Sequence, residues 1–337
     1  MFAYTMRRLL AAIPILFAAS VIVFSLVAIS GDPLEPLRLR TPPVPQQTIL
    51  NQEHRLYLDR SIPERYWTWL TGFGANPGDD IGIIRGNFGP SVRASVDIGT
   101  ELGDRAWVTL RLVFVAMFLA VILAIFAGVI SAVKQYSKID YSFTFFGFLA
   151  LSIPTFWFAI LLKSGGIYYN QATGTSTFFT IGNKSPDTAS FTTWQNITDV
   201  AGHMVLPTLS LMLISYASWS RYQRGSMLEV LNSDYVRLAR AKGLRNRQVM
   251  VRHALRTALI PLTTVTALDI GGIIGGAVIT ETVYEWRGLG KMLVESVNGR
   301  DVFSVLAWLL FAGFVVVVFN IIADLLYAVL DPRIRYE

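Results

Sequence analysis

The residues of this chain best suited to bind a charged partner lie between Ser233 and Pro261, in the stretch SDYVRLARAKGLRNRQVMVRHALRTALIP. From Ser233 to Arg256 there are seven basic side chains and one acidic one, Asp234, so the formal charge is seven minus one, or +6. The whole chain also has a formal net charge of +6, so the remainder is charge-balanced. A segment this basic could bind a nucleic acid, an anionic lipid or an acidic protein. The basic residues are Arg237, Arg240, Lys242, Arg245, Arg247, Arg252 and Arg256.

Other patterns that could support catalysis are weak. The run Gly288-Leu289-Gly290-Lys291 resembles part of a phosphate-binding loop, but no glycine stands at the required spacing before Gly290 and neither Ser nor Thr follows Lys291. The chain has no cysteine, which excludes disulfides, thiolate catalysis and Cys-ligated metals. The three histidines are too scattered in sequence to indicate a site. No residue pattern in the chain therefore predicts ATP hydrolysis or another catalytic activity.

Composition indicates a membrane protein. Hydrophobic residues make up 53% of the chain, charged residues only 15%, and the mean hydropathy is +0.48, more apolar than a soluble domain of this size requires. The apolar residues occur in blocks about as long as a bilayer span; an uncharged 22-residue block would extend roughly 33 Å as a helix. We therefore predict an all-α polytopic protein with six transmembrane helices at Leu9–Ser30, Trp107–Val133, Tyr141–Leu162, Met204–Trp219, Ala258–Tyr284 and Val302–Leu330.

Two features of these blocks need separate interpretation. Met6-Arg7-Arg8 before the first block is typical of a signal peptide, but the block is longer than a signal core and Asp32-Pro33 follows it, which favours an uncleaved helix. Pro154 in the third block is expected to kink that helix, which membrane helices tolerate.

The long polar segment 31–104 is rich in turn-forming residues, and we predict that it is an extracytoplasmic insertion after the first helix. Tyr66, Trp67 and Trp69 within it indicate a short amphipathic helix with an aromatic face. That face either lies at the membrane interface or fills a small core.

Arginine and lysine in the short loops fall on one side of the six predicted spans, which places that side and both termini in the cytoplasm. The basic stretch is then the main cytoplasmic loop. No recognisable nucleic-acid motif accompanies its charge, so a nucleic-acid partner is not expected.

The pattern inside the basic stretch predicts two helices joined by a glycine turn. Ser233 is suited to cap the first helix, on which Tyr235, Leu238 and Ala239 fall on one face. Gly243 can end that helix in the left-handed conformation. Asn246 is expected to cap a second helix, in which Val251, Leu255 and Ala258 recur at helical spacing. The simpler alternative is a solvated basic loop that follows the positive-inside rule.

Several stretches, in order along the chain, resemble a known family. They are LSIPTFW at 151–157, GSMLEVLNSDYVRLARAKGL followed by RHALRTALIP, GGAVITETVYEWRGLGKMLVESVNGRD at 275–301 and NIIADLLYAVLDPRIR at 320–335. The amino end and the run GNFGPSVRASVDI match less specifically. Together they resemble the B-type permease subunits of dipeptide and oligopeptide ABC importers, over nearly the whole chain.

In that family the corresponding loop contains the EAA motif, a coupling helix that docks into a groove of an ATPase subunit. By resemblance, Arg237, Leu238 and Ala239 occupy the Glu-Ala-Ala positions and Gly243 is the motif glycine. Arg237 departs from the general motif, and this departure resembles the peptide branch of the family. Small residues would allow close approach, apolar residues would make contacts, and basic residues would pair weakly with carboxylates of the partner. The candidate coupling residues are Tyr235, Arg237, Leu238, Ala239, Ala241, Lys242 and Gly243.

Asp269 lies well inside the fifth predicted span, where a charged Asp costs about 2.5–3.5 kcal/mol on insertion scales. We expect it to line the transport route and to favour the cationic amino termini of peptides. Gly272 and Gly276, separated by four positions, either line the route or allow close helix packing.

The resemblance implies the type I ABC importer permease fold and import of di- or oligopeptides by alternating access. The implied partners are a second, similar permease, two ATPase subunits that bind ATP and Mg, an extracytoplasmic peptide-binding protein and membrane lipid. The chain itself would bind no cofactor and would not be an enzyme. Alternatives are the same architecture importing nickel, haem or a glycoside, and a secondary transporter, which would require several intramembrane acids. The expected organisation is a cytoplasmic tip and first helix at 1–30, the insertion at 31–104, a five-helix core at 105–330 with the coupling loop at 221–257, and a cytoplasmic tail at 331–337.

Overall fold

The structure is a computed structural model of the 337-residue chain, and it describes all residues except 1, 94–95, 187, 189 and 331–337. For residues 2–5, 7–9, 270–272, 274–276 and 323–330 it describes the backbone and not the side chains. Over the described residues the regular elements are helices, with two isolated β-bridges, Gly82 to Asn87 and Pro90 to Asp97. The predicted all-α class is confirmed. The contacts divide the chain into two compact units: unit 1 is Met1–Thr109 with Arg287–Val317, and unit 2 is Leu110–Trp286 with Val318–Glu337. The predicted tail at 331–337 lies outside the described residues.

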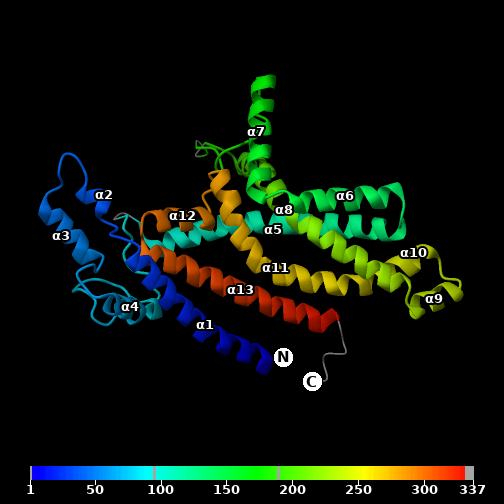
Figure 1. Cartoon of the computed structure of the whole chain (residues 1–337), viewed down its shortest axis with the longest axis horizontal. Helices are drawn as coiled ribbons and strands as arrows, with labels where there is room; N and C mark the ends of the chain where they lie inside the picture. The colour runs from blue at the N-terminus through cyan, green and yellow to red at the C-terminus, as the bar shows by residue number, and fades with distance from the viewer. Residues whose placement is uncertain (1, 94–95, 187, 189, 331–337) are drawn as a thin grey trace. The chain divides into compact units, whose positions relative to one another are not determined.

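Unit 1 contains the first long helix, the polar segment that follows it, and parts of two later helices (Figure 1). Its elements are α1 (Phe2–Ile29), α2 (Glu35–Arg38), α3 (Gln46–Arg55), α4 (Ile62–Thr71), a 3-10 helix (Ile83–Arg85), the start of α5 (Ile98–Val133), α12 (Leu289–Asn298) and the start of α13 (Val302–Leu330).

A continuous apolar core joins these elements. Phe24 of α1, Trp69 of α4, Met292 of α12 and Phe303 of α13 are buried in it together. The segment 31–104 therefore packs with α1, α12 and α13 and does not build a core of its own. The loop between the last two predicted spans contributes the short helix α12 to this core.

The aromatic face predicted at Tyr66, Trp67 and Trp69 belongs to helix α4, whose contacts distinguish a position at the membrane interface from a position in a core. It begins with a capping box, in which the Glu64 carboxylate accepts a bond from the Ser61 backbone N–H (3.1 Å). Trp69 is fully buried and its indole N–H donates to the Phe88 carbonyl (3.1 Å), while the Tyr66 ring packs on Phe24 with centroids 5.3 Å apart. Trp69 and Tyr66 thus fill a core, and only Trp67 is exposed.

Unit 2 contains the rest of α5 and the helices up to α11: α6 (Lys138–Ser152), α7 (Thr155–Thr173), α8 (Thr193–Leu231), α9 (Asp234–Ala241), α10 (Asn246–Gln248), a π-helix (Val249–Leu255) and α11 (Arg256–Val283). Helix α8 is central, because α6, α7 and α11 all pack against it (Figure 1). Helix α5 approaches α8 closely at Gly128, where a Cβ atom would lie 2.7 Å from the Gln223 Cβ and 2.8 Å from the Ser220 carbonyl oxygen.

Four helices are long and apolar enough to cross a membrane, within the described residues: Leu10–Ile29, Ile98–Val133, Thr193–Leu231 and Val302–Ile322. The pair α6 and α7 makes a fifth candidate if it counts as one broken span. Helix α11 corresponds to the predicted block Ala258–Tyr284, but part of it lies outside the described side chains. The total of six spans stays a prediction.

The chain does bend at Pro154 in the third predicted span, but the bend is a break between two helices and not a kink within one helix. Helix α6 ends at Ser152, α7 begins at Thr155, and the two are bent by 102°. Ile153 is extended (φ −91°, ψ 123°), which is the conformation favoured before a proline, and Pro154 has no N–H to continue the helix. By contrast Pro207 lies inside α8, which extends well beyond the predicted block Met204–Trp219 on both sides.

Candidate functional site

The predicted coupling helix is present as α9, and its two end signals behave differently. Ser233 is extended (φ −72°, ψ 151°) at the N-cap position, but its hydroxyl donates back to the Val230 carbonyl (2.6 Å) and does not cap an N–H of α9. Gly243 has φ +73°, so the left-handed turn predicted there is confirmed. No atom lies within 4 Å of the place where a Gly243 Cβ would stand, so glycine is favoured by backbone conformation and not by lack of space.

The side chains of α9 divide between an inner and an outer face. Val236 and Ala239 are buried, while Tyr235 and Leu238 are 43% and 55% exposed. The prediction that Ala239 shares a face with Tyr235 and Leu238 was therefore wrong, because the boundary of the core runs between them. Ala239 packs within its own chain, and the surface open to a partner contains Tyr235 and Leu238, with the exposed Arg237, Ala241, Lys242 and Gly243.

The inner face of α9 packs into a cluster that joins four other helical segments. Buried members are Ala132 at the end of α5, Met227 at the end of α8, Val249 and Ala254 in the π-helix, and Ala258 in α11. A change in the position of α9 would therefore disturb packing at the ends of α5, α8 and α11 together.

The segment after Gly243 differs from the predicted second helix. Asn246 is the first residue of α10, whose N-cap is Arg245, so the predicted cap is displaced by one residue. Val251 was expected on the inner face but is 59% exposed. The reason is the π-helix: its wide turns place residues five apart, Val249 and Ala254, on the buried side.

All seven cations of the basic stretch are exposed. Arg237 lies 3.7 Å from Asp234, but both side chains are largely in solvent and such a pair contributes little. In the part of the chain that the structure describes, no carboxylate pairs with the other six. This surface therefore combines unneutralised positive charge with exposed apolar side chains, as a docking surface for an acidic protein would.

Asp269 lies on α11 and contacts α8. Its carboxylate accepts a hydrogen bond from the indole N–H of Trp219 (2.7 Å), a side chain that is fully buried. The carboxylate is thus anchored by a neutral donor, and its negative charge is not neutralised by that contact. The side-chain surroundings of Gly272 and Gly276 lie outside the described residues.

Sequence reasoning missed a buried ion pair beside the turn between α5 and α6. Asp140 is buried, and its carboxylate accepts bonds from Arg224 of α8, from the Ser131 hydroxyl and from the Tyr136 backbone N–H (2.9 Å). The available signal was a single acid two residues after Lys138, in the first turn of the helix that follows a basic turn.

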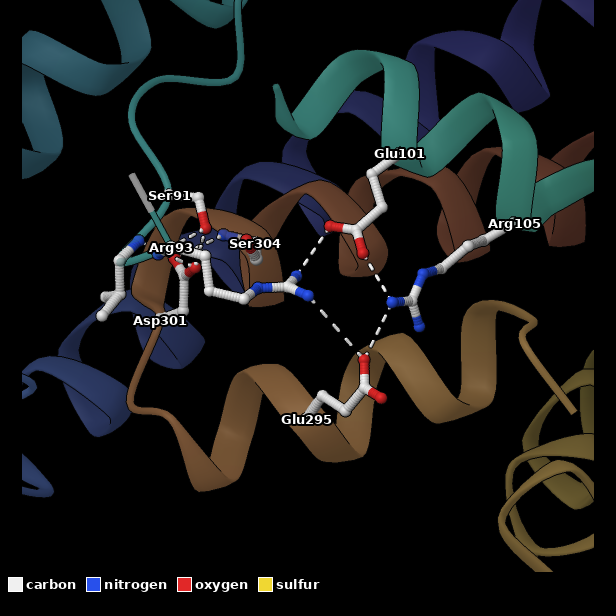
Figure 2. Close-up of polar contacts among 8 residues, drawn as sticks. Ser91, Arg93, Glu101, Arg105, Glu295, Asp301 and Ser304 are labelled. Carbon is white, nitrogen blue, oxygen red and sulfur yellow. Dashed lines mark hydrogen bonds and ion pairs between the residues drawn. The ribbon is translucent and has the colours of Figure 1, made fainter. Parts of the chain in front are cut away.

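A second missed network lies in unit 1, where Figure 2 shows four charged side chains in a ring. Glu101 accepts from Arg93 (2.7 Å) and Arg105 (2.5 Å), Glu295 pairs with Arg105 (2.8 Å), and Arg93 lies 3.9 Å from Glu295. The ring joins the loop before α5 to α5 itself and to α12.

Beside the ring, Asp301 connects the same loop to α13 (Figure 2). Its carboxylate accepts from the Ser91 hydroxyl (2.6 Å) and the Val92 backbone N–H (3.0 Å), and its other oxygen accepts from the Ser304 N–H (3.2 Å) at the start of α13. Ser91 and Val92 lie about two hundred positions before Asp301, so no local pattern could have indicated these two contacts.

Comparison with known proteins identifies related sequences over the full chain. Residues 107–336 match the family model for the binding-protein-dependent transport system inner membrane component. The chain is 38% identical over 332 residues to the oligopeptide transport system permease protein OppB of Mycobacterium tuberculosis, covering 98% of both chains. It is 37% identical to the oligopeptide transport system permease protein AppB of Bacillus subtilis and 35% identical to the dipeptide transport system permease protein DppB of Alkalihalophilus pseudofirmus, covering 100% of each chain in both cases.

Among solved structures, the chain is similar to one from the MetNI methionine ABC transporter in inward-facing conformations. The TM-score is 0.52 at 18% sequence identity, over 68% of this chain and 96% of that one. At this identity the similarity shows the fold alone, and it confirms the predicted type I permease fold.

Proposed function

This chain belongs to the family of binding-protein-dependent transport system inner membrane components, and we propose that it is the permease subunit of an ATP-driven importer of di- and oligopeptides. The cargo class rests on the relatives, because those covering the whole chain at 35–38% identity are oligopeptide and dipeptide permease proteins. The protein is a multi-pass component of the inner membrane, with several apolar helices long enough to span it. We place both termini and α9 on the cytoplasmic side, since the basic residues of the short loops fall there.

The observation that carries the mechanism is the position of α9. Its outer face presents Tyr235, Leu238 and exposed cations, while its inner face is packed against the ends of α5, α8 and α11. A partner bound to the outer face can therefore move several spans at once, which is the requirement for coupling an external energy source to alternating access. In this proposal two ATPase subunits bind ATP and Mg and one of them docks on α9, and the present chain is not itself an enzyme and holds no cofactor.

The remaining partners follow from the family name and from the need for a closed pathway. A second permease subunit of similar fold would complete the pathway, as a paralogue of this chain. An extracytoplasmic binding protein would deliver peptide to the side opposite α9, and lipid would surround the spans.

Two other functions are less well supported. Import of nickel, haem or a glycoside would use the same architecture, but the relatives with full coverage are peptide permeases. A secondary transporter requires several intramembrane acids that interact with its ions or substrate. The mid-span acid Asp269 instead accepts a hydrogen bond from Trp219 of its own chain.

For Asp269 we propose a role in cargo preference. The Trp219 indole is a neutral donor, so this contact supplies no opposite charge to the Asp269 carboxylate, and a cationic peptide amino terminus would supply one. Asp269→Asn retains an oxygen for the Trp219 bond and removes only the charge. Its effect on competition between cationic and neutral peptides tests the role; unchanged uptake of all peptides would exclude it.

The coupling proposal is tested on the outer face of α9. Leu238→Ser and Tyr235→Ser change exposed side chains, so we expect the chain to fold while the co-purifying ATPase subunits are lost or reduced about tenfold. Leu39→Ser, which changes an even more exposed leucine of unit 1, is the matched control and should retain them. ATPase subunits bound equally by all three variants would contradict docking at α9.

Substrate binding by the associated external protein tests the cargo separately. If the ATPase subunits co-purify with this chain but the external protein binds a non-peptide ligand, the ABC permease assignment is kept and the peptide assignment is rejected.

A further inference from the structure

A cavity of about 340 Å³ lies within unit 1, where α1 ends and α13 begins. Part of its wall is apolar and comes from the ends of these two helices, with Val27, Ala28 and Val302. The rest is mainly charged and comes from segment 31–104 and from Arg300 in the loop between α12 and α13. The charged side chains are Asp32, Arg38, Glu53, Arg65 and Arg300.

Two of the three arginines on this wall are neutralised. Arg38 donates from Nε to the Asp32 carboxylate (2.8 Å) and also pairs with Glu53. Arg300 donates to the Asp32 carbonyl (2.9 Å) and to the Glu35 carboxylate (2.5 Å). The two wall carboxylates, Asp32 and Glu53, are therefore engaged by Arg38.

Arg65 of α4 is different. Its side chain is only 7% exposed, yet its guanidinium has no ion pair or hydrogen bond among the described residues, and its buried Nε is unsatisfied. The Phe24 ring, whose centroid lies 5.7 Å from the guanidinium carbon, supplies a cation–π contact. Burial lowers the pKa of Arg65 and the charge of the Asp59 carboxylate raises it, but a guanidinium stays protonated at neutral pH. A buried guanidinium without a hydrogen-bonded carboxylate is costly, so the fold leaves a place for an anion.

We propose that this cavity binds a phosphate oxyanion through the Arg65 guanidinium. Arg38 and Arg300 are paired with carboxylates, whereas among the described residues no carboxylate forms an ion pair with Arg65, and this one guanidinium matches the single negative charge of a phosphodiester. A guanidinium binds phosphate with two parallel N–H donors, which a single carbonyl oxygen cannot accept in the same way.

The source that fits best is the headgroup of a phospholipid. The apolar part of the wall consists of the ends of two helices long enough to span the membrane, so the glycerol and first acyl carbons of a lipid would contact Val27, Ala28 and Val302 while the phosphate reaches Arg65. Free inorganic phosphate has the same oxyanion chemistry and no apolar part.

The test uses the full-length chain, purified in detergent with its co-purifying subunits and depleted of lipid. Its melting temperature is measured while dioleoyl-phosphatidylglycerol, inorganic phosphate or dioleoylglycerol is added. We expect phosphatidylglycerol to raise the melting temperature and dioleoylglycerol, which has no phosphate, not to do so. In Arg65→Gln the phosphatidylglycerol concentration needed should rise about tenfold to hundredfold, as expected for loss of a charge-assisted hydrogen-bond pair.

Two variants complete the design. Arg40→Gln removes an exposed arginine of the same segment and should behave as the unchanged protein. Arg65→Lys keeps the positive charge but lacks the two parallel N–H donors, so it should bind phosphatidylglycerol with intermediate affinity. This variant keeps the test decisive if Arg65→Gln does not fold.

The outcomes separate as follows. Stabilisation by phosphatidylglycerol alone identifies the lipid headgroup, and equal stabilisation by inorganic phosphate identifies the free anion. Equal stabilisation by dioleoylglycerol and phosphatidylglycerol, or an unchanged affinity in both Arg65 variants, would overturn the proposal.

Discussion

Arg224 of α8 forms a forked ion pair with Asp140 at the start of α6, with Nε and one terminal nitrogen each 2.8 Å from a different carboxylate oxygen. The side chain of Asp140 is 3% exposed and that of Arg224 is 28% exposed. The pair holds the turn between α5 and α6 against α8, one turn of helix before Met227, which supports α9. It is therefore part of the structure through which movement of α9 would reach the turn between α5 and α6.

The first prediction concerns this pair. Arg224→Leu leaves the buried Asp140 carboxylate without its cation, and we expect a loss of about 3 kcal/mol in the free energy of unfolding. The double variant Asp140→Asn, Arg224→Leu should recover part of that loss, because no buried charge remains. Melting in detergent measures both. The control is Arg221→Leu, which removes an arginine that stacks on Phe148 and, among the described residues, pairs with no carboxylate. An equal loss in Arg221→Leu would reject the assigned role of the Arg224–Asp140 pair.

The second prediction concerns the close approach of α5 and α8. Gly128→Ala places a methyl group within 3 Å of Gln223 and of the Ser220 carbonyl, so α8 must move, at a cost of about 1–3 kcal/mol. Gly103→Ala on the same helix meets no atom within 4 Å and should be neutral or stabilising by about 0.5–1 kcal/mol, because alanine favours helix. A melting temperature that falls as much in Gly103→Ala as in Gly128→Ala would contradict the packing explanation, because a methyl group at Gly103 meets no atom within 4 Å.

The sequence was sufficient for features that depend on local composition. Apolar block length located the long helices, and Gly243 predicted the left-handed turn after α9 because few other residues adopt that conformation. It was not sufficient where the chain departs from regular helix geometry. The π-helix Val249–Leu255 shifts the buried register by one residue, so Val251 points outward and Ala254 inward. No residue type signals a π-turn in advance.

Contacts between distant segments were also beyond sequence reasoning. The burial of Ala239 depends on Val249 and Ala258, which reach α9 only after the chain has turned at Gly243. Likewise Arg105 and Glu295 lie 190 positions apart, and nothing in either neighbourhood indicates the other. The family resemblance supplied the coupling helix, but it did not indicate which face of α9 is free.

The third prediction separates the members of the charged ring in Figure 2. The Arg105 side chain is 14% exposed and lies 2.8 Å from Glu295, whereas the Arg93 side chain is 42% exposed and lies 3.9 Å from it. Double-mutant cycles with Glu295→Gln should give Arg105→Gln a coupling energy of about 1 kcal/mol or more and Arg93→Gln close to zero. Unfolding measured at low and high salt provides the check, because screening reduces exposed pairs most. Equal coupling energies for the two arginines would contradict the geometry.

The fourth prediction is a pH dependence at Tyr57, which lies in segment 31–104 and is 1% exposed. Its hydroxyl donates to the Asp79 carboxylate (2.7 Å) and accepts from the Asn76 N–H (3.3 Å). Burial, and then the Asp79 carboxylate, raise the pKa of Tyr57 to about 12 from its usual 10. The folded state therefore favours the neutral phenol, and this contribution is complete below pH 10 and is lost as the pH rises towards 12. Two pKa units correspond to about 2–3 kcal/mol.

Tyr57→Phe removes both the titration and the hydrogen bonds, so it should be less stable than the unchanged protein at pH 8 by about 1 kcal/mol or more. Because Tyr57→Phe has no phenol to ionise at position 57, only the unchanged protein loses this stabilisation at high pH. The difference in melting temperature between the two proteins should therefore shrink between pH 10 and pH 12. Tyr168→Phe, at a position 74% exposed, is the control and should follow the unchanged protein over the whole range. If the melting curves of Tyr57→Phe and the unchanged protein run parallel from pH 8 to pH 12, the neutral Tyr57 phenol does not contribute to the stability of this segment.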